Sequence, residues 1–367
     1  MSENKQSGIS PHAHTSAFRL GVAYLGCCIG AGYLSGQELF QFFSSHGTWG
    51  FAGLAVAVLC IFLAGWVILS LSVATGETRM DRIVVWFDCK PLRAAVAVFE
   101  VVFLFMIYTL CVAAFGSLLA QIAGLSPLVG GLVFCVLSTT LSLFGVRGLL
   151  HFFSYVIPAL VLTTVLIALL ALCTANGIDF PPTEVGGLIS GFWLFDSVTY
   201  AVFSLFCALP VLVPLGSSVS SLKTARRGAL IGALLIGTLA FVIILAIGTN
   251  PSVASTALPM LELAFTKSRL AGFVYAVLLV FGIFSAGLSS QSAINEYLMQ
   301  RFTAKKRFLI PVSVVTATVA LLLGLFGFRD LIGILYPVFG YIGFLPLALL
   351  FLHALVFYCK RRKEKKK

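Results

Sequence analysis

The residues with the most chemical potential gather in one short segment, GCCIGAGYLSGQE, which runs from Gly26 to Glu38. It lies inside an apolar run over 18–43 that is long enough to cross a bilayer, yet it carries several glycines and a carboxylate. Because glycine weakens the interior of a helix, this segment predicts an interruption at membrane depth. An interrupted helix leaves carbonyl oxygens and amides without partners, and such groups can bind a cation or a carboxylate.

A second segment with suitable chemistry is SAGLSSQSA, from Ser285 to Ala293. Residues three and four positions apart lie on one face of a helix, which places Ala286, Ser289 and Ser290 together. Their carbonyl and hydroxyl oxygens are neutral ligands of the kind that a small hard cation prefers. The alternative is that these small residues only let neighbouring helices pack closely.

The elements that must position these residues are transmembrane helices. The chain is 60% hydrophobic and 10% charged, with a mean hydropathy of +1.06, and apolar runs of about twenty residues predict membrane-spanning helices. The alternating polarity of a membrane barrel is missing from the sequence. We predict an all-α membrane protein with ten spans. The predicted spans cover 18–43, 49–74, 94–123, 127–144, 150–174, 187–216, 228–248, 270–299, 308–327 and 331–359.

The distribution of charge predicts how these spans are oriented. Of the 24 Lys and Arg residues, all but Lys267, Arg269 and Arg329 fall on the side that holds both chain ends. Basic residues gather on the cytoplasmic side of membrane proteins, so both termini are expected there. The net charge of +11 then reflects topology in the lipid bilayer, and no nucleic-acid partner is needed to explain it.

The ten spans divide into two halves of five with opposite orientation. The expected domain organisation is an N-terminal tail (1–17), a single transmembrane domain (18–359) made of two repeats (18–174 and 187–359), and a basic C-terminal tail (360–367). Inverted repeats are typical of secondary transporters, whose site lies where helices are interrupted in corresponding positions. We therefore expect breaks in spans 1 and 6. The break in span 6 is expected near Ser204, ahead of Pro210 and Pro214.

Several motifs carry a resemblance to a known family. The segment IGAGYLSGQELFQFFSSHGTWG resembles the YkvI-like bacterial membrane proteins, a branch of the amino acid–polyamine–organocation superfamily, and ILYPVFGYIG fits that branch as well. The spacing G-x-x-I-G-x-G over 26–32 and the segment SAGLSSQSA are similar to parts of sodium-coupled transporters with the LeuT fold. The resemblance implies this fold in the bacterial cytoplasmic membrane, with spans 1, 2, 6 and 7 rocking against spans 3, 4, 8 and 9.

The same resemblance implies the residues of two sites. A sodium site would be formed by the carbonyls of Gly26, Ile29 and Ala286 and the hydroxyls of Ser289 and Ser290. The implied substrate-binding residues are Gly30, Ala31, Gly32, Tyr108, Ala201, Phe203, Ser204 and Cys207. The amides near the resumed helix would receive a carboxylate, and the apolar lining favours a small neutral side chain. For the tyrosine in span 3, plain packing is an equal alternative.

Two acids inside the predicted spans, Glu38 and Asp196, are candidates for gating or proton binding, because charged groups in hydrocarbon are costly. Glu38 could also contact a substrate amine, or hydrogen-bond to loop backbone and so support the broken helix. A solvated acid in an outer vestibule is the favoured interpretation of Asp196.

These observations predict a secondary active transporter that carries a small neutral amino acid or a similar carboxylate solute together with sodium, without a further cofactor. Span 5 has no Lys or Arg, which favours sodium over proton coupling through a lysine. The alternatives are proton coupling through Glu38 and a membrane sensor that keeps the fold without transport. The motifs HExxH and GxSxG are absent, so an enzyme is not expected.

Overall fold

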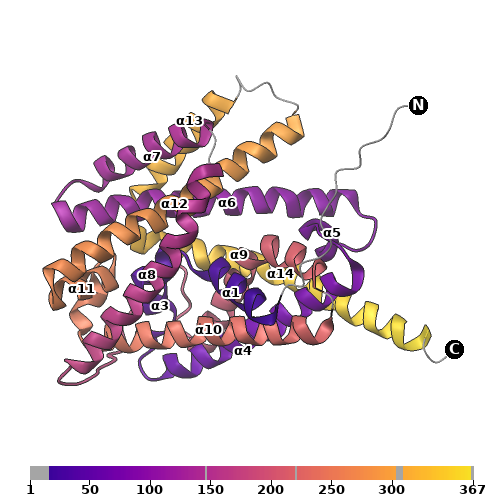
Figure 1. Ribbon diagram of the computed structural model, residues 1–367, viewed down its shortest axis with the longest axis horizontal. Coiled ribbons are helices and arrows are strands. Elements are labelled where there is room, and N and C mark those ends of the chain that lie inside the picture. The colour runs from indigo at the N-terminus through magenta and orange to yellow at the C-terminus, as the bar shows by residue number, and fades with distance from the viewer. Residues whose placement is uncertain (1–15, 145–146, 220, 303–308, 365–367) are drawn as a thin grey trace.

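The computed structural model describes residues 16–144, 147–219, 221–302 and 309–364. Within these ranges every regular element is a helix, which confirms the predicted all-α class (Figure 1). Helices are the expected outcome, because a spanning segment in hydrocarbon must satisfy its backbone hydrogen bonds internally.

Seven of the described helices are long and apolar enough to cross a membrane. They are α4 (Trp49–Thr75), α6 (Lys90–Ala123), α8 (Arg147–Cys173), α9 (Trp193–Ser217), α10 (Leu222–Gly248), α12 (Arg269–Phe302) and α14 (Phe328–Glu364). Three shorter apolar helices are α1 (Ala17–Cys28), α7 (Pro127–Phe144) and α13 (Leu309–Gly324). The chain is therefore an integral membrane protein, and the count of ten spans with cytoplasmic termini stays a prediction.

The helices pack in two groups. In one group α1, α4, α9 and α10 lie against one another, and in the other α6, α7, α12 and α13 do so, the second group filling the upper part of Figure 1. Glycine allows the close approach of α1 and α10, since a Cβ placed on Gly232 would lie 2.6 Å from the Tyr24 ring. Spans 1, 2, 6 and 7 are thus grouped separately from spans 3, 4, 8 and 9.

The first predicted span consists of three helices rather than one. After α1 ends at Cys28, Ile29 and Gly30 are extended, and α2 (Ala31–Ser35) begins. At Gly36 the backbone has a φ of +80°, a left-handed conformation that glycine adopts without steric cost, and α3 (Gln37–Phe42) follows in a new direction.

The predicted break in the sixth span is wrong, because α9 runs without interruption from Trp193 to Ser217. Pro210 and Pro214 lie inside this helix. Each proline removes one N–H donor and so one helical hydrogen bond, but neither supplies the left-handed or extended backbone that ends a helix. Since much of α9 is buried against α4 and α14, the remaining helical hydrogen bonds are kept.

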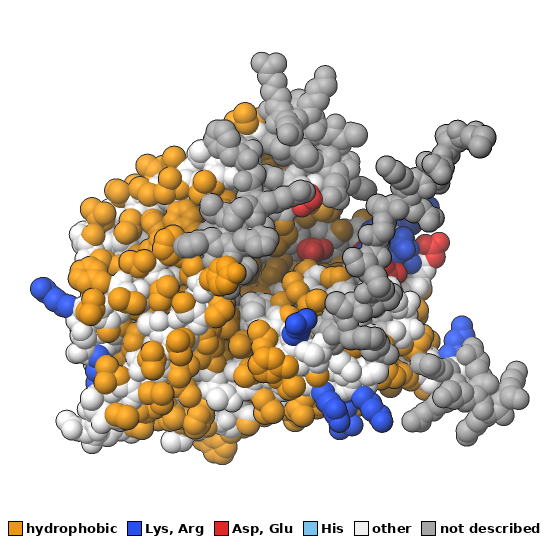
Figure 2. Space-filling view, in the orientation of Figure 1, with side chains coloured by type: hydrophobic (Ala, Val, Ile, Leu, Met, Phe, Trp, Pro, Cys, Tyr) orange, Lys and Arg blue, Asp and Glu red, His pale blue; other side chains and the backbone are white. Residues whose placement is uncertain are grey.

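Four short elements join the long helices. They are the 3₁₀ turns η1 (Ser44–His46) and η2 (Pro251–Ser255) and the helices α5 (Met80–Val84) and α11 (Pro259–Lys267). Neither short helix is among the predicted spans. On the face that Figure 2 shows, the exposed side chains are largely apolar, and Lys and Arg side chains are few.

Candidate functional site

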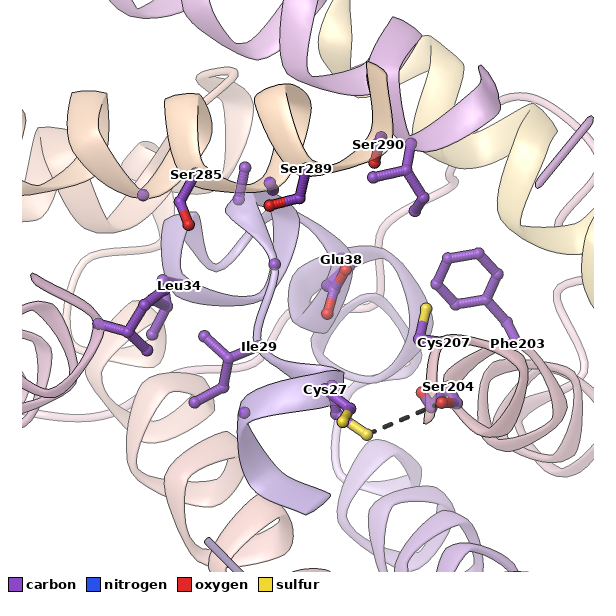
Figure 3. Close-up of a pocket in the computed structure, with 18 of the residues that line it drawn as sticks. Cys27, Ile29, Leu34, Glu38, Phe203, Ser204, Cys207, Ser285, Ser289 and Ser290 are labelled. Atoms are coloured by element: carbon purple, nitrogen blue, oxygen red, sulfur yellow. Dashed lines mark hydrogen bonds between the residues drawn. The ribbon is translucent and has the colours of Figure 1, made fainter. Parts of the chain in front are cut away.

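A cavity of about 320 Å³ lies at the interruption of the first span. Its walls come from the end of α1, the start of α2, and from α3, α6, α8, α9, α12 and α14 (Figure 3). Both packing groups therefore contribute to it, and so does α14. Such a volume is at the lower end of the range for small-molecule sites, so it suits a small solute.

The wall from the first span exposes main-chain oxygens. Ile29 donates its N–H to the carbonyl of Leu25, and this is the last turn of α1. Because Ile29 and Gly30 are extended, the later carbonyls of α1, including that of Gly26, lack the donors that a continuing helix would supply. Gly26 and Ile29 both line the cavity.

The facing wall is the segment of α12 that carries small polar residues. Ala286, Ser289 and Ser290 all line the cavity, and Figure 3 shows Ser285 and Ser289 on the face of α12 turned toward the interrupted segment. The hydroxyls of Ser289 and Ser290 have no hydrogen-bond partner within the described residues. The five residues of the predicted sodium site are thus brought to one cavity, while binding of the ion stays a prediction.

No group of His, Cys, Asp or Glu side chains in the described ranges could hold a metal ion. A transition metal would need nitrogen, thiolate or carboxylate ligands of this kind. The oxygens of α1 and α12 are neutral carbonyls and hydroxyls, which suit an alkali cation instead.

The predicted substrate-binding residues divide into two sets. Gly30, Ala31, Phe203, Ser204 and Cys207 line the cavity.

The others, Gly32, Tyr108 and Ala201, do not line it. Tyr108 shares a hydrogen bond of 2.9 Å with Ser138 of α7, so its hydroxyl is engaged within the second packing group. Ala201 of α9 is fully buried. A Cβ on Gly32 would lie 2.8 Å from Glu38 Oε2, so this glycine leaves room for the Glu38 carboxylate.

Glu38 is the acid of this cavity. Its side chain is 3% exposed, and it accepts hydrogen bonds from two tyrosine hydroxyls. Tyr200 of α9 donates to Oε1 at 3.2 Å, and Tyr336 of α14 donates to Oε2 at 2.5 Å. The predicted contact of Glu38 with loop backbone is therefore replaced by contacts that join α3 to two long helices.

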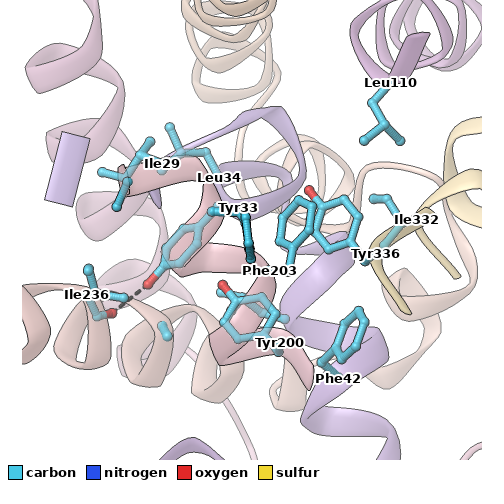
Figure 4. Close-up of a cluster of buried hydrophobic side chains, with 14 of the residues drawn as sticks. Ile29, Tyr33, Leu34, Phe42, Leu110, Tyr200, Phe203, Ile236, Ile332 and Tyr336 are labelled. Atoms are coloured by element: carbon cyan, nitrogen blue, oxygen red, sulfur yellow. Dashed lines mark hydrogen bonds between the residues drawn. The ribbon is translucent and has the colours of Figure 1, made fainter. Parts of the chain in front are cut away.

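Aromatic rings surround this carboxylate. The Phe203 and Tyr336 rings are stacked with their centroids 3.8 Å apart, and the ring centroids of Phe42 and Tyr200 are 5.5 Å apart (Figure 4). To the left of these rings in Figure 4, the Tyr33 hydroxyl donates to the carbonyl of Ile236 at 2.5 Å, which attaches α2 to α10. Apolar packing and directed hydrogen bonds thus hold the pieces of the first span in place.

Sequence reasoning missed both tyrosines that contact Glu38. Tyr200 and Tyr336 are 162 and 298 positions from it along the chain. The only available signal was that Tyr336 lies in the segment ILYPVFGYIG and Tyr200 begins the proline-containing segment of span 6. Such a signal indicates no partner, because it contains no spacing that relates the tyrosines to the acid.

Asp196 has a structural role and is not the solvated vestibule acid that was expected. It is 1% exposed, and Oδ1 accepts from the amide and the hydroxyl of Ser190 at 2.9 and 2.8 Å. Oδ2 accepts from the amide of Gly191 at 3.0 Å and lies 3.3 Å from His46 Nε2. The carboxylate therefore organises the loop before α9, since backbone donors surround it, and it is outside the cavity lining.

The chain is homologous to two proteins of Bacillus subtilis (strain 168), while no known protein-family profile matches it. It is 24% identical to the uncharacterized membrane protein YkvI over 356 residues, which cover 96% of this chain and 98% of YkvI. It is 23% identical to the uncharacterized protein YyaD over 335 residues, or 90% and 95% of the two chains. The predicted resemblance to YkvI-like proteins is thereby confirmed.

Solved structures show the fold. A Na⁺-coupled sialic acid symporter in a substrate-bound outward-open state has a TM-score of 0.57 at 16% identity, covering 93% of this chain and 79% of its own. Mhp1 in an inward-facing conformation has a TM-score of 0.55 at 14% identity, and the match covers 99% of this chain and 82% of the Mhp1 chain. MhsT in complex with L-phenylalanine has a TM-score of 0.54 at 16% identity, and the match covers 94% of this chain and 88% of the MhsT chain. The architecture is that of LeuT-fold transporters, as the motifs predict.

Proposed function

We propose that this protein is a secondary active transporter, not an enzyme, and that it binds its solute and a sodium ion in the cavity at the interruption of the first span. The observation that carries the proposal is the convergence of two oxygen-bearing walls on that cavity. One wall is the end of α1 with Gly26 and Ile29, and the other is the α12 segment with Ser289 and Ser290. Freed carbonyls and unpartnered hydroxyls can replace the hydration shell of a small cation.

The solved relatives of the fold support this class of function. The sialic acid symporter is Na⁺-coupled, and other structures with this fold include a manganese transporter of Eremococcus coleocola. MhsT was solved with L-phenylalanine bound. Because one protein of this fold couples its solute to Na⁺, we favour coupling to an ion here as well.

The solute that we propose is a small neutral amino acid or a similar carboxylate solute. The cavity is small, and the side chains of Phe103, Ile107 and Phe203 give it apolar walls. Transport would proceed by alternating access, in which the group of α1, α4, α9 and α10 moves against the group of α6, α7, α12 and α13. Sodium would favour the conformation that accepts the solute, because a ligand shifts a population toward the state that it binds better.

The proposal is tested with the double substitution Ser289→Ala and Ser290→Ala. For the wild-type protein, sodium should raise the thermal midpoint and the affinity for an amino acid found by screening, since a ligand that binds only the folded state stabilises it. The double variant should lose this sodium dependence. Ser285→Ala is the matched control, because Ser285 lines the cavity on the same helix but is outside the proposed ion site.

Two alternatives have distinct outcomes. If binding is indifferent to sodium but follows pH, and Glu38→Gln removes the pH dependence, a proton on Glu38 is the coupling ion. That alternative has support in the burial of Glu38 next to the cavity. If the protein binds a solute but proteoliposomes never accumulate it, the protein is a sensor with this fold.

A further inference from the structure

The described lining of the cavity contains an acidic side chain and no basic one. Glu38 carries the only carboxyl group among the described residues that line it, and none of these residues is Lys, Arg or His. The described ion pairs do not include Glu38. A carboxylate at this depth is costly unless a positive charge or several hydrogen bonds compensate it, so the site as built favours a ligand with a positive charge.

The hydrogen bonds that Glu38 already makes do not use all of its capacity to accept. Tyr200 donates one hydrogen bond to Oε1 and Tyr336 donates one to Oε2, and both donors are neutral. A carboxylate has about four lone-pair sites, so about two stay open. The two tyrosines hold the carboxylate in one orientation, since they come from different helices.

The surroundings of the carboxylate also suit a cation. Tyr336, which donates to the carboxylate, is stacked on Phe203, and both rings line the cavity, where aromatic faces attract an ammonium group. The carbonyls at the end of α1 belong to residues that also line the cavity, and a carbonyl can only accept hydrogen bonds. An ammonium group, which only donates, suits these carbonyls and the carboxylate better than a ligand that only accepts.

We propose that Glu38 is the counter-ion for a protonated amine on the solute, held against the stacked rings of Phe203 and Tyr336. The inference rests on the proposed function, in that it takes this cavity as the solute site. It revises the proposed substrate class, because an amine becomes the required group and a carboxylate solute without an amine is excluded. Glu38 is then a specificity-determining residue that binds the solute directly.

The test compares ligands that share a side chain but differ in whether they carry the amine, the carboxylate or both, in binding assays on the purified full chain. The probes are valine, isobutylamine and 3-methylbutanoate, together with equivalent trios built on the skeletons of alanine, leucine and phenylalanine. At least one amine or amino acid should raise the thermal midpoint, and the carboxylate of the same trio should not. The proposal is overturned if the carboxylates bind as well as the amines, or if no amine in the panel binds.

Substitutions then assign the preference to Glu38. Glu38→Gln should weaken binding of the preferred amine by roughly 30-fold or more, the loss expected when one partner of a buried charge pair is removed. Glu262→Gln is the matched control, because Glu262 is hydrogen-bonded by Gln121 away from the cavity. An unchanged amine affinity in Glu38→Gln contradicts the proposal.

A second variant covers the case in which Glu38→Gln fails to fold. Tyr336→Phe keeps the carboxylate and removes one hydrogen bond, so it should retain the preference for amine over carboxylate even where affinity falls. Loss of that preference in a folded Tyr336→Phe protein overturns the proposal. Uptake into proteoliposomes is scored separately, so a protein that binds amines without transporting them contradicts the proposed function and leaves the amine site intact.

Discussion

The first span and α9 are the first spans of the two predicted repeats, yet their backbones differ. The first span is divided into α1, α2 and α3, whereas α9 is continuous over its whole length. Glycines lie at the divisions of the first span, including Gly30 and Gly36, and prolines lie inside α9. The difference shows that in this protein a glycine with a compatible conformation divides a span, while an interior proline does not.

Tertiary contacts explain why the divided span is stable. Tyr275 donates to the carbonyl of Leu34, and Gln41 donates to the carbonyl of Arg329. Together with the contacts of Tyr33 and Glu38, these bonds attach each short helix to a longer neighbour. In α9 the hydroxyls of Ser204 and Ser197 instead donate to carbonyls of the same helix. These hydrogen bonds are local and attach α9 to no other helix.

The largest loss of stability is expected when Gly36 is replaced by a residue with a side chain. A side chain there is strained by the φ of +80°, and its Cβ would lie 2.8 Å from Ile247. Gly36→Val should lower the free energy of unfolding by about 2–5 kcal/mol through backbone strain and overpacking. Thermal unfolding of the purified protein measures the change.

Gly26→Ala is the matched control for this prediction, because a Cβ at Gly26 meets nothing within 4 Å. It should shift the thermal midpoint far less than the change at Gly36. Equal losses at both glycines would contradict the view that the turn at Gly36 is what maintains the divided span.

An intermediate loss of stability is expected from removing the tyrosine hydroxyls that attach Glu38 of the first span to α9 and α14. Tyr336→Phe should cost about 1.5–3 kcal/mol, since it removes a short hydrogen bond to an acidic group. Tyr200→Phe should cost less, because its hydrogen bond is longer at 3.2 Å. Thermal unfolding of the two single variants tests the order, and a larger loss from Tyr200→Phe would contradict it.

The smallest effect is expected from Pro210 in α9. Pro210→Ala supplies an N–H to the preceding turn of a helix that is already continuous, while it makes the unfolded chain more flexible. These effects oppose each other, so the free energy of unfolding should change by no more than about 1 kcal/mol. A large loss of stability would mean that the proline has a structural role in α9 comparable to that of Gly36 in the first span.

Local patterns in the sequence predicted much of the fold. Long apolar runs predicted α4, α10 and α12 closely, because a span needs a minimum number of apolar residues whatever surrounds it. The spacing of Ala286, Ser289 and Ser290 predicted their shared face, since helical periodicity is a property of the local chain. The short helix α11 was not anticipated, because it is too short to stand out in hydropathy.

The candidate site was predicted less completely. Gly26, Ile29, Phe203, Ser204 and Cys207 line the cavity as expected. For Tyr108, the sequence left solute binding and packing as equal alternatives, because it does not show which neighbour the hydroxyl meets.

By itself the sequence determined that this chain is helical, lies in a membrane, and interrupts its first span near Glu38, because hydropathy and glycine content act within a few turns of helix. Only the tertiary structure decided that α9 stays continuous, that Asp196 accepts hydrogen bonds from the loop before α9, and that Tyr200 and Tyr336 donate to Glu38. These outcomes depend on groups that are far apart in the chain and meet only when the helices pack, and no local pattern carries that information.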